Sequence, residues 1–237
     1  MRSGIHDMTR LLHIDSSVRD QGSHSRDVAA IFRHAFDDAL PTAHVTYRDL
    51  ATAPPPHLID AVAASMISSA ERSSDQRRAL KIQDELIEEF LAADAYLVSM
   101  PMYNYSVPST IKAWIDHLMV PDRIMTPDGV ASPIQDRPIT VVASFGGGYG
   151  PGTPKEDWDF LRPYLNKIFV DTMEMNLTII DVELTNSTYV PNLAHLLPLH
   201  EQSRAAAVLQ ATDQAEAVAK ALDRSVDPTT ESAAVSY

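Results

Sequence analysis

The feature of this chain that most limits its possible folds is a regular alternation between short apolar segments and longer segments with helical periodicity. Five apolar segments have the length of buried strands, and they span residues 10–15, 44–50, 95–100, 138–144 and 177–184. Helical patterns occupy residues 28–39, 76–93, 108–119, 154–171 and 208–222. Strands that alternate with helices predict an α/β fold, in which one five-stranded parallel sheet has helices on both faces.

The expected start of the fourth helix depends on a local motif. Thr153 and Glu156 have the spacing of a capping box, and Pro154 stands at the first helical position, where a missing N–H does no harm. This pattern predicts a helix that begins at about residue 154 and continues to about Asp171.

The composition limits both the size of the fold and its partners. With 237 residues, of which 45% are hydrophobic, the chain can bury one sizeable core. We therefore expect a single domain over residues 10–222, with a short leader at 1–9 and a flexible tail at 223–237. A net charge of −13 argues against binding to nucleic acid or to an anionic membrane, because both need clustered lysine and arginine. A phosphate-bearing ligand must be held by local donors against this overall field.

The chain contains no cysteine, which excludes disulfides, thiolate chemistry and cysteine-based metal sites and favours a reducing cytoplasm as its location. No stretch approaches the roughly 18 apolar residues of a membrane span, and no apolar signal segment precedes the first strand. The nine histidines form no metal-binding pattern, since His195 and His200 have no carboxylate at ligand spacing. We therefore expect no metal site.

Ligands of parallel α/β sheets bind outside the carboxyl ends of the strands, and three of the predicted strand ends carry unusual residues. The first is DSSVRDQGSHSRDV, in which Ser16, Ser17, Ser23 and Ser25 crowd a loop that leads into a helix. A helix N-terminus offers free N–H groups and serines add neutral donors, so this loop suits a terminal phosphate monoester. It is not a P-loop, because the Gly-x-x-x-x-Gly-Lys-Ser pattern is absent. The alternative is that one serine caps the helix and the others are ordinary loop residues.

The second strand end continues as PMYNYSVPSTIKAWID, residues 101–116. Tyr103 and Tyr105 offer flat apolar faces, while Asn104 offers both a donor and an acceptor. Pro101 and Pro108 stiffen the segment, so that backbone groups can be held against a planar ligand. The alternative is an aromatic turn that packs against the sheet.

The third strand end is followed by the glycine-rich stretch SFGGGYG, residues 144–150. The Gly-x-Gly-x-x-Gly spacing of dinucleotide-binding loops cannot be placed in it. Glycines let backbone N–H groups approach a ligand closely, for instance a carbonyl-rich ring that becomes anionic. The alternative is a flexible loop. Together, a phosphate-binding loop, an aromatic wall and an N–H-rich loop at one sheet edge predict a flavin mononucleotide (FMN) site.

These motifs resemble those of the FMN-dependent NADH:quinone oxidoreductases called azoreductases, which have a flavodoxin-like fold. The similarity covers residues 10–222 and is carried by SS…GSHS in the first loop, PMYNYSVPSTIKAWID in the second and SFGG in the third. It implies the strand order 2-1-3-4-5, non-covalent FMN, NADH or NADPH as electron donor, and a homodimer whose substrate pocket the partner subunit completes. It also implies a ping-pong cycle, in which flavin N5 carries a hydride to a quinone or an azo compound without a catalytic side chain.

Carried over by position, the resemblance implies three groups of FMN-binding residues. The phosphate and ribityl chain are assigned to Ser17, Ser23, His24 and Ser25, the isoalloxazine to Pro101, Met102, Tyr103, Asn104 and Tyr105, and its pyrimidine edge to Ser144, Phe145, Gly146 and Gly147. The sequence departs from the family pattern at two places. Phe145 replaces the arginine of the usual Ser-Arg-Gly-Gly, and VPDRIMTPDG stands where the family usually has Arg-x-Gly-x-Thr-Phe.

Further functional classes share part of this pattern. A flavodoxin-type electron carrier has the same FMN loops but no covered substrate pocket, whereas segments 50–74 and 120–134 are long enough to roof one here. A general NAD(P)H:flavin or nitro reductase, or an FMN-free structural dimer, could also carry such loops. A hydrolase is disfavoured, because Ser144 lies in no Gly-x-Ser-x-Gly elbow. Trp114 and Trp158 are expected in the core or at the dimer interface.

Overall fold

The structure is a computed structural model that describes residues 8–58, 69–127 and 130–223. The predicted leader and tail lie mostly outside these ranges, as do residues 59–68 and 128–129 of the two segments predicted to roof a pocket. The strands of the sheet are β1 (Arg10–Asp15), β2 (His44–Asp49), β3 (Ala95–Pro101), β4 (Pro138–Ser144) and β5 (Asn176–Val182). All pairs are parallel and the order is β2-β1-β3-β4-β5, which confirms the predicted topology.

Burial explains which segments became the central strands. All seven residues of β3 are buried, as are six of the seven in β4 and five of the six in β1. A strand that is covered on both faces needs apolar residues throughout, which is why these segments are continuous apolar runs. β2 lies at one edge of the sheet, and none of its residues is fully buried.

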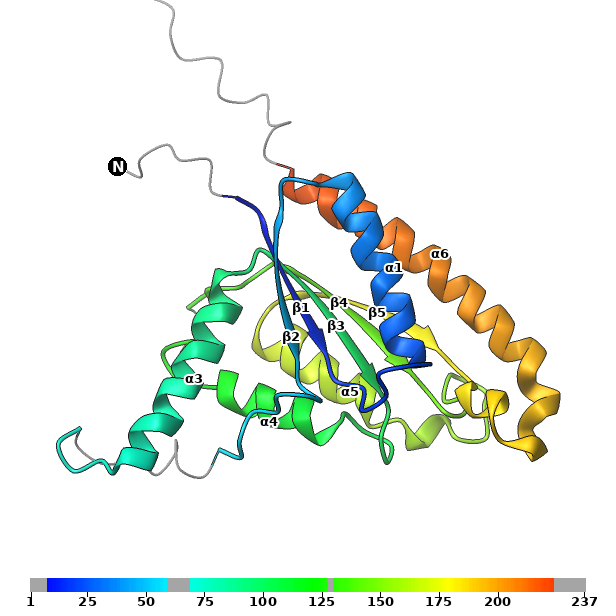
Figure 1. Ribbon diagram of the computed structural model, residues 1–237, viewed down its shortest axis with the longest axis horizontal. Helices are drawn as coiled ribbons and strands as arrows, with labels where there is room; N and C mark the ends of the chain where they lie inside the picture. Colours follow the sequence, from blue (N-terminus) through cyan, green and yellow to red (C-terminus); the bar gives the residue numbers. More distant parts are fainter. Residues whose placement is uncertain (1–7, 59–68, 128–129, 224–237) are drawn as a thin grey trace, which may run out of the picture.

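The register brings the carboxyl ends of the strands together at one end of the sheet. Asp15, the last residue of β1, pairs with Asp49 of β2 and with Ser99 of β3. Pro101 at the end of β3 pairs with Ser144 at the end of β4. The loops that follow these strands therefore begin side by side, at the edge marked by the arrowheads in Figure 1.

Helices cover both faces of the sheet (Figure 1). The helices that pack on it are α1 (His24–Ala39), α3 (Ser74–Ala92), α4 (Ser109–Leu118), α5 (Leu161–Leu165) and α6 (Leu197–Leu222). α1 and α6 share one core, in which Phe32 and Phe36 pack with alanines of α6. The other three helices share the core on the opposite face, where Phe90 meets Trp114 edge to face at 5.6 Å.

The helix before β5 begins later than predicted. Residues 151–154 form turns, Glu156–Trp158 form a short 3₁₀ helix, and α5 starts at Leu161. The Thr153 hydroxyl donates to the carbonyl of Gly150 (2.8 Å) and does not cap a helix. The predicted start at residue 154 is therefore wrong.

Asp159, the residue before the N-cap Phe160, accepts from the first N–H groups of α5 instead. Its Oδ1 accepts hydrogen bonds from the N–H groups of Leu161 (2.9 Å) and Arg162 (3.1 Å). The helix continues as a π-helical segment, Asn166–Thr172, so its predicted end near Asp171 is confirmed.

The last helix begins before its predicted start at residue 208, with a proline in its first turn, where no N–H partner is needed. Among the described residues, no helix has both the length and the apolar character that crossing a membrane requires.

Candidate functional site

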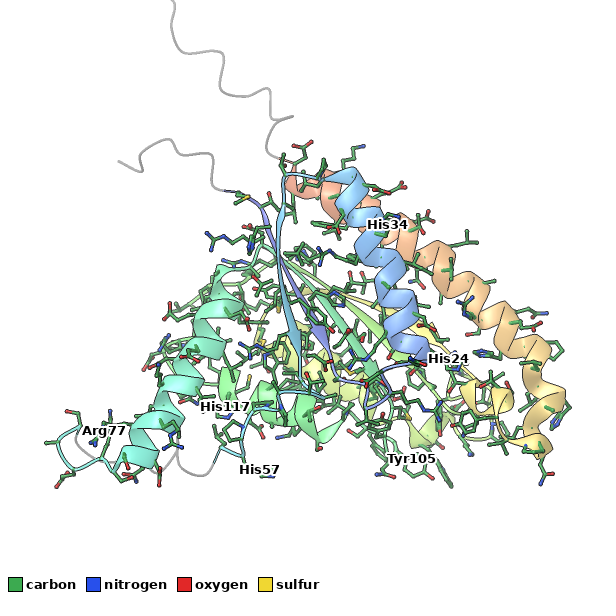
Figure 2. All side chains as sticks on the ribbon, in the orientation of Figure 1. His24, His34, His57, Arg77, Tyr105 and His117 are labelled. Carbon is green, nitrogen blue, oxygen red and sulfur yellow. The ribbon has the colours of Figure 1, made fainter. Side chains whose placement is uncertain are left out.

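A cavity of about 340 Å³ opens at the end of the sheet that is formed by the carboxyl ends of the strands. Its walls come from the loops after β1, β3, β4 and β5. Figure 2 shows two of its lining residues, His24 and Tyr105, at this edge. The volume is in the range of small-molecule sites, and the position is the one where parallel α/β sheets bind their ligands.

The first wall is the loop between β1 and α1. Gly22 has a positive φ of 65°, which lets the chain turn into the helix. Ser23 caps α1, with its hydroxyl 3.5 Å from the Arg26 nitrogen, and Ser17 lines the cavity beside it. The first N–H groups of a helix have no partner within the helix, so this end of α1 offers donors and a positive dipole end to an anion.

A buried carboxylate stands at the start of this loop. Asp15 accepts hydrogen bonds from Ser99 (2.5 Å), Tyr47 (2.8 Å) and Arg26 (3.0 Å), and His13 Nε2 lies 3.2 Å away. Burial alone would raise the pKa of Asp15. The hydrogen bond and charge of His13, with the hydrogen bonds of Ser99 and Tyr47, outweigh it and lower this pKa to about 2. The carboxylate therefore stays ionised throughout the ordinary pH range.

Arg26 connects this carboxylate to the cavity wall. Its guanidinium pairs with Asp15 (3.0 Å) and Asp49 (2.9 Å) and donates to the carbonyl of Ser17 (2.7 Å). Burial alone would lower the pKa of Arg26, but Asp49 and Asp15 raise it. The ion pairs thus fix the backbone of a residue that lines the cavity.

The second wall is a hairpin that follows β3. Tyr103 and Ser106 exchange backbone hydrogen bonds of 3.0 and 3.2 Å, and the two residues between them have positive φ, 49° at Asn104 and 71° at Tyr105. A type I′ turn requires positive φ at both positions and favours asparagine first and glycine second. A tyrosine at the second position is strained, and Tyr105 lines the cavity while it remains 40% exposed.

The third wall is the loop that follows β4. Gly146 lines the cavity, and a Cβ at this position would lie 2.7 Å from Asn186 Nδ2, so any other residue would force the Asn186 side chain to move. Within the described part of the chain, the N–H groups of Gly146 and Gly147 donate to no other group. The Gly146 N–H is therefore available to a ligand in the cavity, whereas Gly147 does not line the cavity.

The fourth wall is the loop after β5, which we did not predict. Thr185, Asn186 and Tyr189 line the cavity. The N–H and hydroxyl of Thr185 both donate to the carbonyl of Phe145 (3.0 Å each), and the Asn186 N–H donates to the carbonyl of Gly146 (3.1 Å). The Tyr189 hydroxyl donates to Asn186 Oδ1. These bonds attach the fourth wall to the third.

Known proteins share both the sequence and the fold. A family model described as a flavodoxin-like fold matches residues 9–197. An FMN-dependent NADH:quinone oxidoreductase of Frankia casuarinae is 43% identical over 205 residues, which cover 86% of this chain and 97% of the relative. One from Streptomyces coelicolor is 43% identical over 217 residues, 91% of this chain and 97% of the relative. The chain belongs to the flavodoxin-like family of FMN-dependent NADH:quinone oxidoreductases.

Solved structures of azoreductases share the fold of this family member. The azoreductase from Bacillus anthracis str. Sterne has a TM-score of 0.77 at 20% identity, over 89% of this chain and all of that chain (100%). An FMN-dependent NADH-azoreductase from Bacillus anthracis str. Ames Ancestor, solved in complex with FMN, has a TM-score of 0.72 at 19% identity, over 91% of this chain and 99% of that chain.

Most of the residues that the family resemblance implies meet in one place. Ten of the thirteen line the cavity, namely Ser17, Ser23, His24, Pro101, Met102, Tyr103, Asn104, Tyr105, Ser144 and Gly146. Ser25 does not line it, because it is completely buried, with its hydroxyl 3.4 Å from that of Ser23. Gly147 and Phe145 also lie outside its lining.

Phe145, at the position of the arginine usual in the family, has its side chain in the core instead of in the cavity. The ring is completely buried, and its N–H donates to the carbonyl of Val182 (2.8 Å). The Arg162 guanidinium lies over the ring, 4.2 Å from its centroid, and pairs with Asp181 (2.8 Å) and Asp159 (2.7 Å). Burial alone would lower the pKa of Arg162, but these two carboxylates raise it. Phe145 therefore stabilises the loop by packing in the core and does not line the cavity.

Six lining residues were not predicted: Arg19, Gly22, Tyr149, Thr185, Asn186 and Tyr189. Arg19, Gly22 and Tyr149 belong to loops that the sequence had already singled out. The other three follow the fifth strand, and the carboxyl end of any strand in a parallel sheet lies at the same edge. The prediction of a fifth parallel strand was therefore the signal that could have found them.

Three aromatic rings cluster at the cavity, which Tyr105 and the largely buried Tyr149 line. Tyr105 meets Trp158 edge to face at 5.3 Å and Tyr149 at 6.5 Å, and Trp158 is 47% exposed. Trp114, in contrast, is fully buried in the core, as expected. The mouth thus offers flat apolar surface next to the polar interior.

The histidines near the C-terminal helix take separate positions. His200 is buried, with Nδ1 2.7 Å from the carbonyl oxygen of Glu183, and its ring packs against that of His24 at 4.8 Å. His195 lies in a 3₁₀ helix (Pro191–Leu196) before α6. In the described ranges no group of three or more histidine or carboxylate side chains is arranged to hold a metal.

Proposed function

We propose that this protein is an FMN-dependent NADH:quinone oxidoreductase that also cleaves azo compounds reductively. The observation that carries the proposal is the convergence of a helix N-terminus, a Tyr-Asn hairpin and a glycine loop on one cavity. The 43% identical relatives are described as having the quinone reductase activity. The B. anthracis azoreductase with the same fold binds FMN.

The lining residues fit the successive parts of FMN. The N-terminus of α1, with Ser17 and Ser23, would hold the phosphate, because its N–H groups and hydroxyls are donors for an anion. The Tyr103–Asn104 hairpin would lie along the planar ring system. Gly146 would admit the edge of the ring at a point where any Cβ would collide with Asn186.

When bound, FMN supplies hydride acceptance from NADH and two-electron donation to the acceptor. The protein orients the ring and stabilises charge. The free N–H group of Gly146 would favour the negative charge that gathers on the edge of the reduced ring. Asp15 contributes indirectly. It pairs with Arg26, and the Arg26 guanidinium donates to the Ser17 carbonyl and so holds the Ser17 backbone in position.

The aromatic mouth suits a flat acceptor. The exposed rings of Tyr105 and Trp158 meet edge to face beside the cavity, where a quinone or the arms of an azo compound could stack. Such a surface favours small aromatic acceptors over a protein acceptor, which needs open access to the cofactor.

We also propose that residues 10–222 act as one FMN-binding domain in a cytoplasmic homodimer, whose partner subunit completes the acceptor pocket. Exposed aromatic side chains beside the cavity support the dimer: Trp158 is 47% and Phe160 60% exposed. Clustered apolar surface of this kind is typical of an interface. Light scattering of the purified protein tests it, and a monomeric mass at assay concentrations would contradict it.

Steady-state kinetics of the purified protein test the proposed activity. We expect a yellow protein that oxidises NADH rapidly with menadione and slowly with cytochrome c, a one-electron protein acceptor. A colourless protein whose absorbance and melting temperature do not respond to added FMN would refute the cofactor. Fast reduction of cytochrome c with little turnover of menadione would instead indicate an electron carrier.

A further inference from the structure

We propose that Arg19 and Tyr189 form a clasp across the phosphate end of the cavity, in which Arg19 supplies the positive charge for the FMN phosphate and Tyr189 holds Arg19 in place. This inference rests on the proposed FMN site and extends it. Neither residue belongs to the motifs that carry the family resemblance.

The cavity has little positive charge to offer a phosphate. Among its lining residues in the described ranges, Arg19 is the only arginine or lysine. His24 also lines it, but burial lowers its pKa, as does the nearby charge of His200, so His24 is neutral at neutral pH. The protein as a whole carries a net charge of −13. A bound phosphate dianion therefore depends on Arg19 for its charged hydrogen-bond partner.

Arg26 cannot take this role. It also lies close to the β1–α1 loop, but it is already paired with Asp15 (3.0 Å) and Asp49 (2.9 Å) behind the cavity wall. Its charge is thus balanced by two carboxylates before any ligand arrives. Arg19, by contrast, has its guanidinium carbon 4.8 Å from the centroid of the Tyr189 ring, a cation–π contact that leaves its N–H donors free.

Tyr189 is well placed to hold the arginine because its own position is fixed. Its hydroxyl donates to Asn186 Oδ1, and the Asn186 N–H donates to the carbonyl of Gly146 (3.1 Å). The contact between Arg19 and Tyr189 therefore joins the loop after β1 to the loop after β5, which is itself hydrogen-bonded to the loop after β4. An exposed arginine loses side-chain freedom when it binds an anion, and a fixed aromatic ring lowers that loss by restricting the side chain beforehand.

The clasp predicts a specific chemical preference. Arg19 contributes to the binding of FMN, which carries the phosphate, and contributes little to the binding of riboflavin, which has the same ring system without it. Tyr189 acts through Arg19, so it too should affect FMN more than riboflavin.

Titration of the FMN-free protein with FMN and with riboflavin, followed by flavin fluorescence, tests the clasp. We expect Arg19→Gln to weaken FMN binding about tenfold, as for loss of one charge-assisted hydrogen bond, and to change riboflavin binding less than about twofold. We expect Tyr189→Leu to weaken FMN binding about threefold. Its effect should be small in a chain that already carries Arg19→Gln, because the two residues act as a unit.

Arg78→Gln is the matched control. It removes the same charge from an exposed position on α3, where Arg78 pairs only loosely with Asp75 (3.5 Å). Wild-type protein that binds no FMN would overturn the proposed function itself. Wild-type protein that binds FMN, with Arg19→Gln indistinguishable from Arg78→Gln, would overturn the clasp alone. Equal losses for FMN and riboflavin in Arg19→Gln would also overturn it, because the phosphate would then not be the group recognised.

Discussion

Replacement of Asp15 by asparagine should destabilise the protein strongly, although the two side chains have nearly the same size. The buried carboxylate accepts from Ser99, Tyr47 and Arg26 and lies 3.2 Å from His13. An amide keeps only one acceptor oxygen and turns two N–H groups toward these donors. The substitution therefore removes a charge and leaves donors unpaired in the same place.

The magnitude follows from the pKa of Asp15. A pKa of about 2 in the folded protein, against the ordinary 3.8, corresponds to about 2 kcal/mol of stability at neutral pH. Unpaired donors raise the expected loss for Asp15→Asn to about 2 to 4 kcal/mol, or roughly 4 to 16 °C in melting temperature for a chain of this size. Because the folded-state pKa is the lower one, this stability is present above about pH 4 and is lost as the pH falls toward 2.

Urea unfolding of the FMN-free protein measures this effect. We expect the difference between wild type and Asp15→Asn to be largest at pH 7 and to decrease by about 1 kcal/mol at pH 3. Asp38→Asn is the control, because Asp38 is 75% exposed on α1. The reasoning is refuted if Asp15→Asn costs no more than Asp38→Asn at pH 7, or if its cost is the same at pH 3 as at pH 7.

Three further substitutions test the walls of the cavity and its support. Gly146→Ala should weaken FMN binding about tenfold in a fluorescence titration, because its Cβ would lie 2.7 Å from Asn186 Nδ2. Adding Asn186→Ala should restore part of the affinity. A double variant with no restored affinity would contradict the steric explanation. Tyr105→Gly should raise the free energy of unfolding by about 0.5 to 1 kcal/mol, because glycine adopts the positive φ without strain. The same variant should have a higher KM for menadione. A variant less stable than wild type would show that the turn is unstrained. Phe145→Ala should lower the free energy of unfolding by about 3 to 5 kcal/mol. Phe160→Ala, at a 60% exposed position, is the control and should lower it by less than about 1 kcal/mol. Similar losses in the two variants would contradict the core placement of Phe145.

The strands and the main loops of the site were predictable because their signals are local. Continuous apolar runs identified β3 and β4, and the alignment of strand ends in a parallel sheet placed the loops after Asp15, Pro101 and Ser144 at one edge. The strand order, in contrast, came from the family resemblance, because periodicity alone does not determine which strands are neighbours.

The late start of α5 was not predictable, because a tertiary contact decides it. Thr153 and Asp159 are both residue types that cap helices, and the capping-box spacing to Glu156 favoured Thr153. In the structure the Phe160 N–H donates to the carbonyl of Tyr105 (3.0 Å) in the hairpin, so residue 160 cannot lie inside a helix that starts at 154. The pairing is between loops that are distant in sequence.

The fourth wall and the position of Phe145 were missed for the same reason. Asn186 reaches the cavity through its backbone bond to Gly146, and Phe145 packs beneath Arg162, whose charge is held by Asp181. Gly146 lies in a loop, Arg162 on α5 and Asp181 on β5. A motif written along the chain shows the residue type at such a position but not the direction of its side chain.

The central claim is that one cavity at the sheet edge holds FMN for two-electron transfer, and anaerobic single-turnover absorbance of the holoprotein tests it most directly. We predict that each chain binds one FMN, that an equimolar amount of NADH bleaches its visible absorbance without any acceptor present, and that equimolar menadione then restores it. A bound flavin that NADH leaves oxidised, or that menadione cannot reoxidise after reduction, would contradict the account.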